Sequence, residues 1–176
     1  MLSLLRKIAA TGRVAEPAPP RPEPGLSPDS ALSPEPAPPD LARRVKALRG
    51  SAQVRCVDAG SCNGCEIEIG QAFGPVYDAE RYGARIVASP RHADVLLVTG
   101  PVTRNMAEPL RRTYAAAAEP RVVIAVGDCA IDCGEFAGGY GVEGAVGDVV
   151  PVDLSVPGCP PAPDQIVAAL RRVTGR

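Results

Sequence analysis

The sequence predicts an α/β fold, a parallel β-sheet with flanking helices, preceded by a short helix and a Pro-rich tether. Short apolar runs alternate with amphipathic segments, which is the pattern of a parallel sheet covered by helices. The runs within 94–100 and 121–127 are apolar at nearly every position, as in strands buried on both faces. Ten of the chain's 20 prolines fall within residues 15–39, where they predict an extended tether without a core.

Length and composition exclude several classes of protein. A chain of 176 residues suggests one folded domain with additions, and the formal net charge of −1 provides no basic field for nucleic acid. We find no secretory leader and no apolar run of the roughly 18–20 residues that cross a bilayer. We therefore expect a cytoplasmic location, where thiols stay reduced and clustered cysteines usually indicate metal or redox chemistry.

The chain divides into three predicted parts. Residues 1–14 form an amphipathic helix, interpreted either as a frayed terminus or as a docking helix for a partner or a membrane surface. Residues 15–39 form the Pro-rich linker, and residues 40–176 form the folded domain. At its start, Asp40 is expected to cap a short helix that ends at Gly50.

The domain itself reads as alternating strands and helices. Strands are expected at 53–57, 85–88, 94–100, 121–127 and 149–154. Helices are expected within 103–118 and from about Pro163 to Gly175. Because proline cannot donate to a sheet ladder, Pro151 predicts that the last strand lies at an edge.

Four of the six cysteines follow predicted strands. Cys62 and Cys65 come after the first strand, Cys129 directly after 121–127, and Cys159 after 149–154. Sites in open α/β sheets assemble outside the carboxyl ends of the strands. Three separate segments would therefore bring four thiols to one edge of the sheet.

Four thiolates suit either zinc or an iron–sulfur cluster. The ligands sit on separate loops, and Pro160 follows Cys159 as at many iron–sulfur sites, so we favour a cluster. A zinc-stabilised interaction module without a redox role is the alternative. A flavin-binding protein is disfavoured by the few aromatic residues and the lack of a phosphate-binding loop.

Other residues near the thiols have less certain roles. Cys133 competes with Cys129 as the third ligand, and Cys129 is preferred because it lies directly at the strand end. Cys56 is interpreted as a small buried apolar residue. Glu66 and Glu68 either face solvent or tune the cluster and carry protons.

Two further sequence features do not indicate a functional site. The G-x-G-x-x-G pattern at 139–144 does not follow an apolar strand, so we expect a surface loop rather than a dinucleotide site. His92 is the only histidine and is expected to be structural. The chain shows no self-contained active site.

Five motifs, in this order, carry a family resemblance: Ser61-Cys-Asn-Gly-Cys-Glu-Ile-Glu68, Ser89-Pro-Arg-His-Ala-Asp94, Thr99-Gly-Pro101, Gly127-Asp-Cys-Ala130 and Val156-Pro-Gly-Cys-Pro-Pro161. From about residue 40 to 173 the chain resembles the cluster-bearing small subunits of group 4 membrane-bound [NiFe] hydrogenases, including formate hydrogenlyase. These are similar to the subunit of NADH:quinone oxidoreductase (complex I) that carries the quinone-reducing cluster.

The resemblance implies a flavodoxin-like fold holding one [4Fe–4S] cluster on Cys62, Cys65, Cys129 and Cys159. It implies an electron-transfer subunit that is not catalytic alone. Its expected partners are a hydrogenase-type large subunit, a ferredoxin-like iron–sulfur subunit and, indirectly, membrane subunits. Its expected place is peripheral, on the cytoplasmic side of the inner membrane.

Departures from the family patterns favour the hydrogenase branch. Complex I subunits carry adjacent cysteines at the first site, whereas Asn63 and Gly64 separate the two thiols here. The segment after Pro161 also lacks the arginine common in complex I. Glu68 matches the acidic position of complex I subunits, and 132–134 replaces the Ser-Gly-Gly frequent after the third ligand. A quinone-reducing subunit of complex I remains the alternative function.

Overall fold

The computed structural model describes residues 6, 7, 10 and 40–176. Most of the predicted docking helix, and the whole linker at 15–39, lie outside the described residues. Five parallel strands form the main sheet in the order β2 (Ala84–Ile86), β1 (Ala52–Asp58), β3 (Val95–Thr99), β5 (Val122–Val126) and β7 (Leu154–Val156). Counted along the chain, this is the order 2-1-3-4-5 of flavodoxin-like folds, so the predicted fold class is confirmed.

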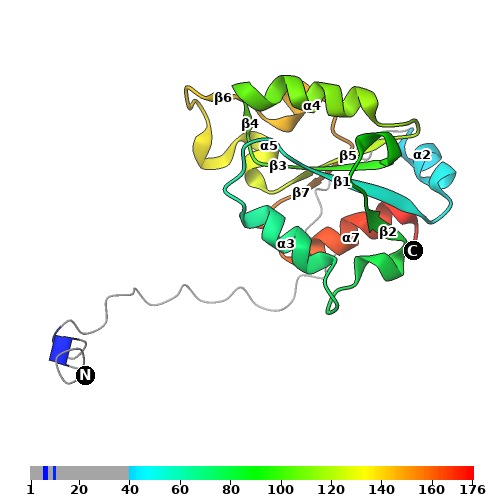
Figure 1. Cartoon of the computed structure of the whole chain (residues 1–176), viewed down its shortest axis with the longest axis horizontal. Coiled ribbons are helices and arrows are strands. Elements are labelled where there is room, and N and C mark those ends of the chain that lie inside the picture. The colour runs from blue at the N-terminus through cyan, green and yellow to red at the C-terminus, as the bar shows by residue number, and fades with distance from the viewer. Residues whose placement is uncertain (1–5, 8–9, 11–39) are drawn as a thin grey trace.

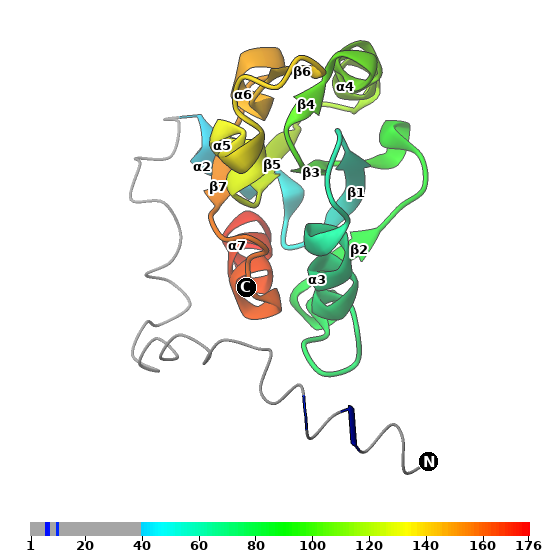
Figure 2. The same ribbon diagram turned by 90° about the vertical axis from the view of Figure 1, so that its left-hand side faces the viewer.

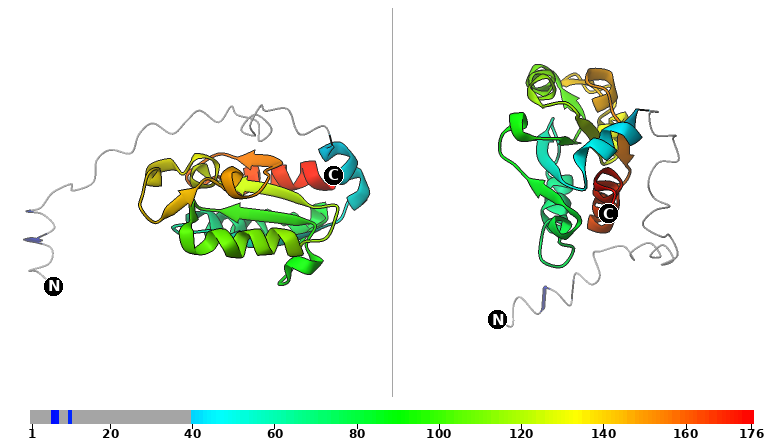
Figure 3. Two further views of the ribbon diagram at one scale, coloured as in Figure 1. Left: turned by 90° about the horizontal axis from the view of Figure 1, so that it is seen from above. Right: turned by 90° about the vertical axis from the view of Figure 1, so that its right-hand side faces the viewer.

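Helices cover both faces of this sheet (Figures 1 and 3). The α-helices are α2 (Leu41–Leu48), α3 (Gly64–Ala72), α4 (Arg104–Ala116), α5 (Asp128–Asp132), α6 (Val146–Val149) and α7 (Pro163–Thr174). Short 3-10 turns are η2 (Ala79–Tyr82), η3 (Pro90–His92) and η4 (Gly134–Phe136). In Figure 3, α4 lies on the opposite face of the sheet from α7.

The central strands explain why the sequence shows continuous apolar runs. Along β3, Val95 and Leu97 join the core under α3 and α7, while Leu96 and Val98 join the core under α4. All four side chains are fully buried. Because each strand faces a helical layer on both sides, truncating one such side chain, as in Leu97→Ala, is expected to cost about 2–5 kcal/mol of stability.

The last strand differs from its prediction. Val149 ends α6, and β7 begins only at Leu154, so the predicted strand at 149–154 is wrong in its bounds. Pro151 has no N–H to donate and lies in the connection between the two elements. The edge position was correct, since β7 pairs only with β5 in the described sheet.

Two local expectations also fail. Asp40 has helical backbone angles and makes no side-chain cap, and its carboxylate instead contacts Arg44 one turn later. The segment at 139–144 is only partly a loop. Its end forms β6 (Val142–Gly144), which pairs antiparallel with β4 (Val102–Thr103).

Candidate metal centre

The four predicted ligand thiols lie in loops at the carboxyl ends of three strands. Cys62 follows β1, and Cys65 lies in the first turn of α3. Cys129 lies in α5, immediately after β5, and Cys159 follows β7. Figure 2 views the domain from this edge, with the start of α3 and α5 toward the reader. Cys62 and Cys159 are exposed, Cys129 is half-buried and Cys65 is buried.

Side-chain hydrogen bonds shape the turn that carries the first two thiols. Asp58, the last residue of β1, accepts hydrogen bonds through Oδ1 from the backbone N–H groups of Gly60 and Ser61, both at 2.8 Å. Ser61 Oγ accepts one from the N–H of Asn63 at 3.0 Å. Asn63 adopts φ +70°, a left-handed conformation that asparagine tolerates better than most residues. The turn is therefore fixed by its own polar side chains.

Glu66 ties this turn to the sheet. Its carboxylate accepts hydrogen bonds from the hydroxyl of Ser61 at 2.6 Å and from that of Thr99 at the end of β3. The Thr99 side chain is 1% exposed, and its hydroxyl also lies 3.3 Å from the carbonyl oxygen of Val57. Glu68 is half-buried and has no polar partner among the described residues. The two glutamates therefore differ, and only Glu66 belongs to the framework of the site.

The thiols lie on three loops, of which the first follows β1, the second follows β5 and the third follows β7. Gly127 lets the second loop approach the first. It has φ +91°, and a β-carbon added there would lie 2.6 Å from Sγ of Cys65 and 3.4 Å from the carbonyl oxygen of Gly158. Any side chain would therefore occupy the space between Cys65 and the loop after β7. The contact with Cys65 leaves no room for a β-carbon, so glycine is needed at this position.

The second and third loops are joined directly. The N–H of Asp128 donates to the carbonyl oxygen of Gly158 at 2.9 Å, and the N–H of Gly158 donates to Asp128 Oδ1 at 2.7 Å. The first and third loops also meet, because a β-carbon on Gly64 would lie 3.5 Å from Sγ of Cys62 and 3.8 Å from Pro160. All three cysteine-bearing loops thus form one assembly.

The thiols also influence one another electrostatically. Burial raises the pKa of Cys65 to about 12, with the nearby Glu66 and the other three thiols contributing in the same direction. Burial also raises the pKa of Cys129, followed by repulsion from Cys159 and Cys62. The raised pKa values keep the thiols of Cys65 and Cys129 protonated, and a metal centre that bound them as thiolates would displace these protons.

The remaining two cysteines stand apart from this group. Burial, then Asp148 and Asp132, raises the pKa of Cys133, and no other thiol contributes. Burial raises the pKa of Cys56 to about 11, and its thiol lies in β1 beside the core under α3 and α7. Cys133 has φ +70° and caps α5, which gives it a structural position.

Four thiolate donors suit either a single zinc ion or an iron–sulfur cluster, and these two differ in the spacing that they require. Zinc held at about 2.3 Å from each sulfur would need neighbouring sulfurs roughly 4 Å apart. Within residues 40–176, no three His, Cys, Asp or Glu side chains converge closely enough to hold one metal ion. A cluster is larger, because each thiolate binds a different iron atom. The donor set is therefore compatible with an iron–sulfur cluster.

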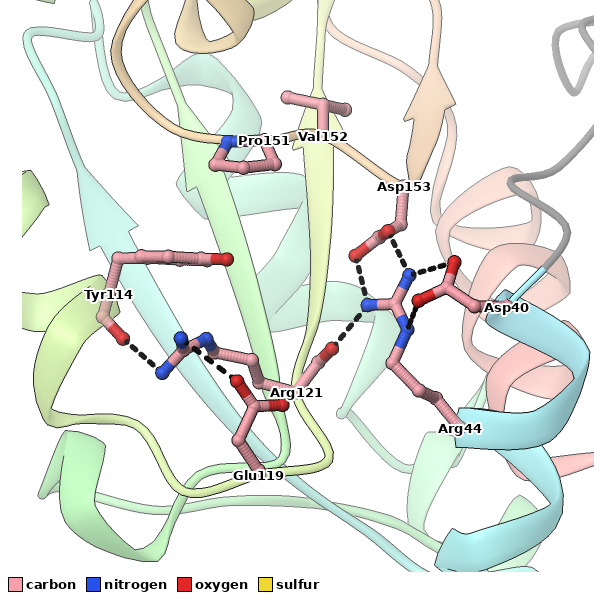
Figure 4. A pocket seen from close by; sticks show the side chains of 8 residues that line it. All are labelled: Asp40, Arg44, Tyr114, Glu119, Arg121, Pro151, Val152 and Asp153. Carbon is pink, nitrogen blue, oxygen red and sulfur yellow. Dashed lines mark hydrogen bonds and ion pairs between the residues drawn. The ribbon is translucent and has the colours of Figure 1, made fainter.

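A second polar hollow of about 320 Å³ lies at the opposite, amino-terminal edge of β5 and β7 (Figure 4). Its charges are paired with one another. Arg44 binds Asp153 through both terminal nitrogens, at 2.5 and 3.0 Å, and its Nε lies 3.1 Å from Asp40 without hydrogen-bond geometry. Arg121 pairs with Glu119. The ion pairs that line this hollow hold α2 against the sheet, so we interpret the hollow as structural.

Sequence reasoning missed several residues of the site. Ser61, Thr99 and Gly127 contribute to its framework but bear no metal-binding groups. The available signal was that each of the three residues begins one of the five motifs, although no role was assigned to it. His92, expected to be structural, is exposed in η3.

A family comparison settles the wider relationship. The model of the NADH ubiquinone oxidoreductase 20 kDa subunit family matches residues 62–173, which is well over half of the chain. The chain belongs to this family. The match includes all four predicted ligands and confirms the superfamily that the five motifs indicated.

Relatives within the 20 kDa subunit family include hydrogenase subunits. The chain is 49% identical over 119 residues to formate hydrogenlyase subunit 7 of Escherichia coli K12, a match covering 68% of this chain and 47% of that protein. It is 45% identical over 127 residues to the probable membrane-bound hydrogenase subunit mbhJ of Pyrococcus furiosus, covering 72% of this chain and 76% of that one. The chain thus spans about half the length of the first relative.

Solved structures show the same architecture. A chain of the membrane-bound sulfane sulfur reductase, an archaeal respiratory membrane complex, is 30% identical with a TM-score of 0.64. The match covers 74% of this chain and 72% of that chain. Among the described residues of our chain, no helix has the length and apolarity needed to cross a bilayer.

Proposed function

We propose that this chain is an electron-transfer subunit of a membrane-associated oxidoreductase complex of the [NiFe]-hydrogenase type. In this proposal Cys62, Cys65, Cys129 and Cys159 hold one [4Fe–4S] cluster. The chain would relay electrons between a catalytic centre in a large subunit and a ferredoxin-like iron–sulfur subunit. It would lie on the cytoplasmic side of the inner membrane, where the membrane subunits of the complex hold it whether or not it also touches lipid.

One observation carries the proposal: three loops from separate strands bring four mutually interacting thiols to one edge of the sheet. The close approach at Gly127 and the hydrogen bonds between Asp128 and Gly158 hold these loops against one another. The site is therefore preorganised by the fold. When bound, a [4Fe–4S] cluster supplies one-electron transfer, and its potential depends on burial, sulfur hydrogen bonds and nearby charge.

Residues of this chain set the electrostatic environment of the proposed cluster. Cys65 is 8% exposed and lies beside the apolar core, so it keeps water from one side of the site. Glu66 places a carboxylate next to this thiol and holds the turn in place through Ser61. Because negative charge opposes the arrival of an electron, Glu66 should lower the reduction potential. Cys62 and Cys159 leave the opposite side open.

The open side has the character of a protein interface. Around it, the exposed apolar side chains are Ile67 on α3, which is 57% exposed, and Phe136 and Tyr140 after α5, which are 47% and 93% exposed. Glycines surround Tyr140 in the loop at 138–141. Aromatic and aliphatic groups of this kind are enriched at the centres of protein interfaces. We infer that the large subunit covers this face.

The hydrogenase assignment is supported by the Asn63-Gly64 spacing between the first two thiols, together with the names of the two relatives. A quinone-reducing subunit of complex I is the second candidate. It has support from the family match and from the acidic Glu68.

The decisive experiment is anaerobic purification of the full chain with iron, sulfide and zinc analysis. We expect a brown protein with about four iron and four sulfide per chain, the composition of one [4Fe–4S] cluster, and an electron paramagnetic resonance signal after reduction. A colourless protein with one zinc ion per chain would instead support the interaction module.

Two serine variants test the ligand set. Cys129→Ser should lose the cluster, whereas the matched variant Cys133→Ser, four residues away, should keep four iron atoms per chain. If the pattern were reversed, Cys133 would be the third ligand.

A further inference from the structure

A cluster of arginines lies at the end of α7, on the side of the domain away from the thiols. It consists of Arg81 in η2 and Arg171, Arg172 and Arg176 at the carboxyl end of the chain, and we call it the arginine patch. All four side chains are exposed. In Figure 1 this end of α7 lies at the right, whereas α5 and the start of α3 lie at the left.

The arginine patch is arranged by the fold. The guanidinium groups of Arg81 and Arg171 both lie over the ring of Tyr82, at 5.3 and 4.9 Å from its centre. Arg171 Nε also donates to the backbone oxygen of Arg176 at 2.9 Å. Stacking on an aromatic ring holds guanidinium groups in place while their N–H groups stay available.

These charges are not neutralised within the domain. Across the part of the chain that the structure describes, the ion pairs are made by Arg44, Arg112 and Arg121, and none involves the arginine patch. Asp164 lines a surface hollow together with Arg81 and Arg171, but it makes no ion pair with any arginine of the patch. Apart from Nε of Arg171, the guanidinium N–H groups of the patch are therefore available to an external anion.

An apolar tip lies beside the arginines. Val76 is 81% exposed and Tyr77 is 36% exposed, and both line a hollow of about 360 Å³ shared with Arg81, Tyr82 and Arg171. Exposed aliphatic and tyrosine side chains bordered by arginines are typical of surfaces that rest in the headgroup layer of a bilayer. Guanidinium groups pair well with phosphate oxygens, since both geometries allow two parallel hydrogen bonds.

We propose that the arginine patch and the Val76–Tyr77 tip bind the anionic phospholipid surface of the membrane. The arginines contact lipid phosphates, and Val76 and Tyr77 enter the headgroup layer. This contact turns the thiol-bearing edge away from the bilayer, where it stays accessible to partner subunits. The proposal is independent of the cluster, so its failure would leave the proposed function intact.

The test is flotation of the full chain with vesicles of 70% phosphatidylcholine and 30% phosphatidylglycerol, compared with pure phosphatidylcholine. The triple variant Arg81→Gln, Arg171→Gln, Arg172→Gln should lose roughly a hundredfold in binding, since each arginine near an anionic surface contributes about fivefold. Val76→Ser should lose up to roughly tenfold. Binding of the parent chain should weaken as salt rises.

The matched control is the triple variant Arg91→Gln, Arg104→Gln, Arg111→Gln, which removes the same charge from exposed sites on η3 and α4. It should bind like the parent chain. Equal loss in both triple variants, or equal binding to the two kinds of vesicle, would overturn the proposal. So would patch-dependent binding to soluble polyglutamate without binding to vesicles, because that outcome indicates an acidic protein partner.

Discussion

The hydroxyl of Ser61 donates a 2.6 Å hydrogen bond to the carboxylate of Glu66, five residues further along the chain. The same Ser61 oxygen accepts from the N–H of Asn63, in the middle of the turn between the first two thiols. Because Glu66 is also held by buried Thr99, the position of this turn depends on the end of β3. One carboxylate therefore connects the thiol spacing to the sheet.

This relationship predicts different effects at the two neighbouring glutamates. Glu66→Gln should raise the reduction potential of the proposed cluster by roughly 70 mV, the size expected for one charge acting through an effective dielectric constant of about 20 over about 10 Å. Glu68→Gln should have a smaller effect, since Glu68 does not contribute to the raised pKa of Cys65. Redox titration monitored by electron paramagnetic resonance measures both, and equal shifts would contradict the distinction.

A substitution at Gly127 should disturb the site more than the fold. Gly127→Ala places a β-carbon against Sγ of Cys65, on a backbone with φ +91°. We expect loss of most of the cluster and destabilisation by about 1–3 kcal/mol, because φ +91° and ψ 155° lie in a region that is restricted almost entirely to glycine. Iron content and urea denaturation measure the two effects.

Gly70→Ala is the control for this substitution. Gly70 lies in α3, and a β-carbon there would meet nothing within 4 Å. Because alanine favours helix over glycine, this variant should gain up to about 1 kcal/mol and keep its cluster. A Gly127→Ala protein with full iron content would show that the loops can separate without losing the site.

The thiol of Cys56 should make stability depend on pH in the alkaline range. Burial raises its pKa from 9.0 to about 11, so the folded chain keeps a proton that the unfolded chain releases. This contribution is fully present below pH 9 and is lost as the pH rises through 11. The loss is on the order of 2–3 kcal/mol for two pKa units.

Comparing the parent chain with Cys56→Ala isolates this contribution. Urea denaturation between pH 8 and pH 11 should show a shallower decline in stability for the variant. Parallel curves for the two proteins would mean that the Cys56 thiol ionises in the folded chain as readily as in the unfolded one.

We expect the Arg44–Asp153 pair to contribute more to the stability of the domain than an exposed ion pair does. The two side chains are 16% and 8% exposed, and Asp153 also accepts from the N–H of Val123 at 2.8 Å. Asp153→Ala removes the acceptor of the Val123 N–H and leaves Arg44 with only Asp40 and the Arg121 carbonyl oxygen, so it should cost about 3 kcal/mol, the low end for a broken buried pair. The exposed pair of Arg112 and Glu108 is the comparison, since Arg112→Ala should cost at most about 0.5 kcal/mol. Thermal and urea denaturation would reveal whether the two costs differ.

The sequence predicted the sheet and the thiol-bearing edge well because both follow from patterns read along the chain. Fully apolar runs such as 94–100 are typical of strands buried on both faces, and the cysteines after them then share an edge. The first residue of β7 could not be predicted, since Val149 and Val152 are apolar yet lie in α6 and in the connection after it.

The framework of the site was harder to predict because its contacts are distant in sequence. Thr99 meets Glu66 across 33 positions, and a buried threonine does not by itself signal a metal site. Asp40 satisfied the pattern of a helix cap but instead contacts Arg44, which Asp153 holds from 109 positions away. Such contacts depend on the register of the folded sheet rather than on any local pattern.

The two apolar layers on either side of β3 have a consequence for how the mature protein is made. They are closed by aliphatic side chains, and the cysteine loops are tied together by backbone and carboxylate hydrogen bonds. If the thiols hold a cluster as proposed, the chain would fold around its apolar layers first and take up iron and sulfide afterwards. Cys62 and Cys159 are exposed, so under the proposed function we expect cluster loading to precede the assembly of the partner subunit over this edge.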